Sequence, residues 1–74
     1  MIRLSPMELQ VLRTLLERRG NEVMATLLAT SSYDTSVVFA NELLSELRDP
    51  TLWREFLAAC RESGVGPQAR RGGK

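Results

Sequence analysis

The middle of the chain, residues 32–47, contains the longest apolar block in the sequence. Residues 37–40 are four consecutive apolar residues. Because four residues span more than one turn of an α-helix, they cannot all lie on one buried stripe. The same stretch has no basic residue, and its acidic residues are Asp34, Glu42 and Glu46. We therefore predict a central helix here, against which the other helices pack, with apolar surface exposed near its start.

Start and stop signals divide the chain into helices. Ser5 and Glu8 form the pattern of a capping box around Pro6, and Gly20 is suited to the end of that first helix. A second proline, Pro50, separates the last two helices. We predict an all-α fold, a compact bundle of about four short helices at roughly residues 6–19, 22–29, 34–48 and 51–63.

Apolar spacing predicts which sides of the helices are buried. We place Glu8 on the polar side of the first helix. The third helix can begin at Ser32, Asp34 or Thr35, since each is a suitable N-cap. Its inward residues are predicted to be Ala40, Leu43, Leu44 and Leu47. Val38 then lies on the polar side of the same helix.

The length of the chain limits its organisation. Its 74 residues leave room for a single core, so we assign residues 1–65 to one helical domain. Residues 66–74 are rich in glycine and arginine and are predicted to be a disordered tail. A domain of this size usually retains only about 3–5 kcal/mol from its core, so dimerisation or a partner is an additional source of stability to expect.

Charge is distributed unevenly along the chain. Residues 1–63 hold seven arginines and nine acidic residues, a net charge of −2, although the whole chain has a net charge of +1. The basic excess lies in the tail, at Arg70, Arg71 and Lys74. Domains that bind nucleic acid usually have a basic folded surface, because neutralised phosphates supply most of the non-specific affinity. The predicted domain lacks that excess.

The residue types argue against an enzyme. The sequence has no histidine and one cysteine, Cys60, so the commonest general base, the usual zinc ligand sets and an internal disulfide are excluded. We expect no catalytic, cofactor-binding or metal-binding residue, and we expect Cys60 to be a small core residue. No secretion signal or membrane-spanning run is present, so we expect a soluble, cytoplasmic protein.

Residues 4–13, LSPMELQVLR, resemble the opening of the LuxR/FixJ-type helix-turn-helix domain, whose first helix reads approximately L-T-P-R-E-x-E-V-L. Four further residues lie roughly where that family places its second helix and turn: Asn21, Ala25, Leu28 and Ser31. The resemblance, which spans about residues 4–65, implies a helix-turn-helix arrangement in which Thr35 opens the recognition helix. It also implies a DNA-binding transcriptional regulator.

The positions that would read DNA differ from that family's pattern. The expected outward residues are Ser36, Val38, Phe39, Asn41, Glu42 and Ser45, so acid and valine replace hydrogen-bond donors. Base edges and phosphates require donors or positive charge, which disfavours nucleic acid as a partner. In the DNA-binding alternative, Asn41 would contact bases, and the residues that would meet phosphates are Arg48, Arg54, Arg70 and Arg71.

The leading functional prediction is a small, non-enzymatic module for protein–protein interaction. It would act as a regulator or adaptor, either by binding a larger protein of unknown identity or by forming a homodimer. The basis is the apolar, acid-flanked surface expected on the central helix, which suits a protein groove better than a DNA groove. The predicted partner-binding residues are Val37, Val38, Phe39, Asn41, Glu42 and Ser45.

Overall fold

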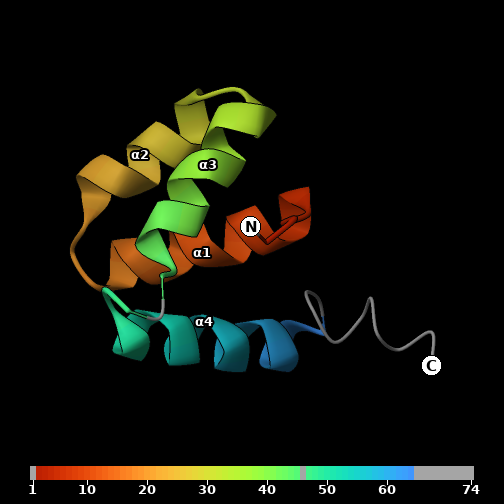
Figure 1. Ribbon diagram of the computed structural model, residues 1–74, viewed down its shortest axis with the longest axis vertical. Coiled ribbons are helices and arrows are strands. Elements are labelled where there is room, and N and C mark those ends of the chain that lie inside the picture. Colours follow the sequence, from red (N-terminus) through yellow and green to blue (C-terminus); the bar gives the residue numbers. More distant parts are fainter. Residues whose placement is uncertain (1, 46, 65–74) are drawn as a thin grey trace.

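Four helices make up the part of the chain that the computed structural model describes, residues 2–45 and 47–64 (Figure 1). They are α1 (Pro6–Arg18), α2 (Glu22–Thr30), α3 (Tyr33–Leu43) and α4 (Pro50–Ser63). The described residues contain no strand. The prediction of an all-helical fold of four short helices is therefore confirmed. The predicted tail, residues 66–74, lies outside the described residues.

Each helix begins at a side chain that accepts a hydrogen bond from its first turn. The N-cap residues are Ser5, Asn21, Ser32 and Asp49. In α1 the capping box is complete, because Glu8 N–H donates to Ser5 Oγ over 3.1 Å and Ser5 N–H donates to Glu8 Oε1 over 2.6 Å. Such caps are each worth about 1 kcal/mol.

The capping box also corrects the predicted position of Glu8. Its side chain is fully buried and does not lie on the polar side of α1. Periodicity alone placed it on the polar side, but its carboxylate turns back to satisfy the Ser5 amide at the start of the helix. A buried acid is tolerated when its oxygens accept hydrogen bonds.

The helix that organises the core is α1, which corrects the prediction for the middle of the chain. Figure 1 shows α1 between the α2–α3 pair and α4, and α1 packs against all three of the other helices. Its most extensive contact is with α2. The buried apolar residues come from all four helices and the segments beside them: Leu4, Leu9, Leu12, Leu16, Ala25, Leu28, Val37, Ala40, Leu44, Leu52, Phe56 and Cys60.

The third helix is shorter than predicted. It ends at Leu43, whereas the apolar spacing indicated a helix to residue 48. Ser45 C=O accepts hydrogen bonds from the N–H groups of Arg48 and Asp49, so the chain turns there. The turn allows both Leu44 and Leu52 to be buried, at 2% and 3% exposure. Leu47, predicted to point inward, is 97% exposed because it lies beyond the end of the helix.

Candidate functional site

The residues predicted to form a partner-binding surface on α3 divide into buried and exposed groups. Val37 is only 8% exposed and belongs to the core, so its prediction as a surface residue is wrong. Ser36, also expected to point outward, is buried, and its hydroxyl donates to Leu28 C=O over 3.0 Å. Val38 is 50% exposed, and Phe39 is half-buried against the core. Helix α3 is therefore rotated about its axis so that residues 36 and 37 pack inward.

Asn41 holds the N-terminal segment against α3. Its Oδ1 accepts from Ile2 N–H over 2.6 Å, and its Nδ2 donates to Ile2 C=O over 2.9 Å and to Val37 C=O over 2.8 Å. Tyr33 supports the same segment, because its hydroxyl donates to Leu4 C=O. Both N–H donors of the Asn41 amide are thus engaged within the chain. A side chain in this state has no donor left for a base edge.

The remaining predicted partner-binding residues lie near the end of α3. Glu42 is exposed and accepts a hydrogen bond from Arg48 over 3.0 Å. Ser45 is half-buried, and its carbonyl closes the turn before α4. The predicted phosphate contacts are not brought together, since Arg48 precedes α4 and pairs with Glu42, whereas Arg54 is exposed on α4. Arg70 and Arg71 lie outside the described residues.

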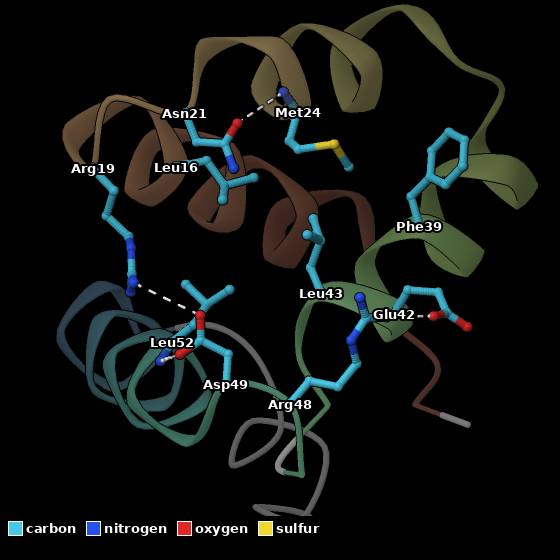
Figure 2. A pocket seen from close by; sticks show the side chains of 10 residues that line it. All are labelled: Leu16, Arg19, Asn21, Met24, Phe39, Glu42, Leu43, Arg48, Asp49 and Leu52. Carbon is cyan, nitrogen blue, oxygen red and sulfur yellow. Dashed lines mark hydrogen bonds and ion pairs between the residues drawn. The ribbon is translucent and has the colours of Figure 1, made fainter.

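A cleft opens between α2, α3 and the start of α4 (Figure 2). Its apolar lining comes from residues far apart in the sequence: Leu16, Met24, Phe39, Leu43 and Leu52. Figure 2 shows Met24 and Phe39 on opposite sides of the opening. The volume, about 460 Å³, lies within the range of pockets that bind small ligands or side chains. We call this feature the α3 cleft.

The charged groups at the α3 cleft are paired with one another. Arg19 contacts Glu55 over 2.8 Å and Asp49 over 3.7 Å, so it joins the end of α1 to the start of α4. Arg48 pairs with Glu42 across the other side of the opening. These exposed pairs contribute little to stability, typically less than about 1 kcal/mol each. The lining of the cleft is therefore half apolar and half polar, and its charges are balanced.

Apolar residues are also exposed on α2, where Val23 and Leu27 line a shallow hollow with Glu22 and Thr26. Val23 is 72% exposed and Leu27 is 38% exposed, and both lie within one helical turn of Met24, which lines the cleft. The acidic residues of the two helices are Glu22, Asp34 and Glu42, all exposed. We call the exposed side chains of α2 and α3 the α2–α3 surface, defined by Glu22, Val23, Leu27, Asp34, Val38, Phe39 and Glu42.

The α2 part of this surface was missed from the sequence. The spacing of Val23, Met24, Leu27 and Leu28 is typical of one apolar side of a helix, but only Leu28 of these is buried. The width of the apolar stripe on α2 could have identified these exposed residues. Adjacent residues 23 and 24 point about 100° apart on a helix, so they cannot both face the core of a small domain.

A second groove lies between α1 and α4. Its apolar residues are Met7, Val11, Leu15 and Ala59, and its volume is about 320 Å³. The first three are spaced by four residues, which places them on one side of α1 beside the buried stripe. The sequence did not indicate this groove, because Val11 and Leu15 also pack partly against the core. Met7, at its edge, is 61% exposed.

Cys60 is fully buried on α4, as predicted. Burial raises the pKa of its thiol from 9.0 to about 11, and the nearby charge of Glu8 adds to this effect. A thiol with a raised pKa is a poor nucleophile, because the thiolate is the reactive form. Within the described residues, no group of three or more acidic or cysteine side chains is arranged to hold a metal ion.

None of the described helices is both long and apolar enough to cross a membrane.

Comparisons with known proteins identified no relative of this chain. No protein-family model, no curated protein and no solved structure matches this chain. The resemblance to the LuxR/FixJ-type domain therefore stays a prediction made from residues 4–13.

Proposed function

We propose that this protein is a small, non-enzymatic interaction module that regulates or adapts a larger protein by binding it through the α2–α3 surface. The observation that supports the proposal most strongly is the exposure of Val38 and Val23, at 50% and 72%, on the two helices whose Phe39 and Met24 line the α3 cleft. Single exposed apolar residues are common, but several on adjoining helices are typical of protein-binding sites.

The interactions of Asn41 and Arg48 further support a protein partner. Asn41 uses its amide to hold Ile2, and Arg48 pairs with Glu42, so the two best candidates for DNA contact already have partners. Neither α2 nor α3 contains a basic residue. A phosphate backbone would meet acidic side chains on this surface, which costs affinity.

A helix-turn-helix regulator that binds DNA is the alternative. It is favoured by the two-residue connection between α2 and α3 and by the exposure of Arg54 on α4. It predicts duplex binding that falls steeply with salt and weakens when Arg48 and Arg54 are replaced together. A gel shift at low ionic strength decides between the two functions, since no shift there removes the alternative.

The proposal is tested by comparing Val38→Ser with Met7→Ser. Both residues are exposed apolar residues, but Met7 lies on the α1–α4 groove and not on the α2–α3 surface. Serine is chosen because Asp34 and Glu42 lie one turn on either side of position 38, and an added acid would be repelled by both. The measurements are self-association by sedimentation velocity and quantitative capture of proteins from the source cell.

We expect Val38→Ser to weaken dimerisation or the capture of a specific protein, whereas Met7→Ser leaves it unchanged. Covering half of a valine side chain contributes about 1 kcal/mol, which corresponds to roughly five-fold in affinity. Equal retention by both variants would remove the α2–α3 surface from consideration. Loss with Met7→Ser alone would move the interaction to the α1–α4 groove.

A further inference from the structure

We propose that the α2–α3 surface binds a basic amphipathic helix of another protein, with apolar side chains of that helix seated over Val38 and in the α3 cleft. This inference rests on the proposed function and specifies the chemistry of the partner. It follows from three features: the charge of α2 and α3, the lining of the cleft, and the charge of the other helices.

The first feature is charge. The described helices α2 and α3 have three acidic residues, Glu22, Asp34 and Glu42, and no lysine or arginine. Of these acids, Glu22 and Asp34 are exposed and form no ion pair within 4 Å with another described residue, whereas Glu42 pairs with Arg48. Two acidic groups therefore flank an apolar surface with no basic group to balance them. Electrostatic complementarity favours a partner that supplies lysine or arginine beside apolar residues.

The second feature is the lining of the cleft. Met24, Phe39 and Leu43 line it, and the charged groups at its rim are paired with each other. An occupant therefore meets these apolar side chains beside polar ones, and no unpaired charge. Its volume of about 460 Å³ admits one or two large apolar side chains. A helix that projects apolar residues at every third or fourth position can reach both the cleft and Val38.

The third feature argues against a second copy of this chain as the occupant. The helices α1 and α4 each hold two arginines and two glutamates, so each has no net charge. The helices α2 and α3 are acidic. No described helix of this protein is therefore basic, and a homodimer would place like or neutral surfaces together. Because none of the helices in residues 2–45 and 47–64 is basic, we assign the complementary helix to a different chain.

The test uses a fluorescein-labelled peptide of about 14 residues, roughly 21 Å long as a helix, composed of leucine and lysine in an amphipathic pattern. Its counterpart replaces every lysine with glutamate. Fluorescence anisotropy measures binding of each peptide to the full chain at about 20 mM and about 200 mM salt. We expect the lysine peptide to bind at least ten-fold more tightly than the glutamate peptide at low salt, with that difference reduced at high salt.

Paired variants separate a specific site from general attraction to an acidic protein. Glu22→Gln combined with Asp34→Asn removes two acids of the α2–α3 surface. Its matched control, Glu17→Gln combined with Glu62→Gln, removes two exposed acids from α1 and α4. We expect the first pair to weaken the lysine peptide by roughly five-fold and the control by less than two-fold. Val38→Ser should weaken it by roughly five-fold as well, and Met7→Ser should not.

Several results would overturn the inference. They are equal binding of the two peptides, equal effects of the paired variants and their control, and a dimer in light scattering that the lysine peptide does not dissociate. If neither peptide binds while Val38→Ser still weakens capture of a cellular protein, the basic helix is wrong and the proposed function stands. If Val38→Ser has no effect in either experiment, both proposals fail.

Discussion

The two halves of this domain differ in the charge and in the exposed apolar residues of their surfaces. The half formed by α1 and α4 has balanced charges, and Arg19 links it internally through Asp49 and Glu55. The half formed by α2 and α3 has three acids and no basic residue. Of the five large apolar residues that are exposed on helices, four lie on α2 and α3: Val23, Leu27, Tyr33 and Val38.

This difference separates residues that stabilise the fold from residues that the fold does not require. In the α1–α4 half, Phe56 is fully buried, and Ser5 and Glu8 form the capping box. Stability of the fold therefore explains why these three residues are present. In the α2–α3 half, a half-exposed valine in the middle of a helix contributes little packing and has a low helix propensity. Surface apolar residues that stability does not explain are candidates for binding.

The largest expected effect compares two phenylalanines, one from each half. Phe56 is fully buried on α4, and Phe39 is half-buried on α3. We expect Phe56→Ala to lower the free energy of unfolding by about 3–5 kcal/mol, enough to unfold a domain of this size. Phe39→Ala, which removes fewer buried contacts, should cost about 1–2 kcal/mol. Urea denaturation followed by circular dichroism measures both, and equal losses would contradict the division between the halves.

The second prediction concerns Asn41. Replacement by alanine removes two hydrogen bonds to Ile2 and one to Val37 C=O, so the free energy of unfolding should fall by about 1–3 kcal/mol. Thermal melting is the measurement, with Ser45→Ala as a comparison on the same segment. A residue placed only to read DNA would leave stability unchanged when replaced, and that result would favour the helix-turn-helix alternative.

The third prediction is a dependence of stability on alkaline pH. The folded pKa of Cys60, about 11, is above its unfolded value of 9.0, so between these values the folded state retains a proton that the unfolded state loses. The contribution is fully present below pH 9 and is lost as pH rises toward 11. The difference in melting temperature between the wild type and Cys60→Ala should therefore narrow over that interval. A constant difference would show that the thiol does not remain protonated in the fold.

The smallest expected effect is that of Val38→Ser on stability. Because Val38 is half exposed and valine and serine have similar helix propensities, the free energy of unfolding should change by less than about 0.5–1 kcal/mol. Circular dichroism and urea denaturation provide the measurement. A larger loss would place Val38 among the residues that stabilise the fold, and the binding experiments with this variant would then need Val23→Ser instead.

Most helix boundaries followed from local chemistry. The proline, glycine and capping residues that mark the starts and ends of helices act on their own turns, so Ser5, Gly20 and Pro50 have the expected roles. The end of α3 did not follow, because Leu47 fits the apolar spacing of a longer helix. Burial of Leu44 and Leu52 together requires the turn at Ser45, and that requirement is tertiary.

The candidate site was only partly predictable for the same reason. The outward positions of Val38 and Glu42 were predicted from the periodicity of their own helix. The rotation that buries Ser36 and Val37 depends instead on the contact of α3 with α2. The α3 cleft joins residues from α1, α2, α3 and α4, and no local pattern indicates such a meeting. The binding of Asn41 to Ile2 is likewise a contact between distant parts of the chain.

The contacts of Asn41 with Ile2 also have a consequence for the order of folding. They close a loop between residues that are 39 positions apart, whereas α1 and α2, which make the most extensive contact, are neighbours in sequence. Because distant contacts require more loop entropy to be lost, we expect the α1–α2 pair to form before the barrier and the N-terminal segment to attach after it. In stopped-flow measurements, Asn41→Ala should then speed unfolding and leave the folding rate nearly unchanged.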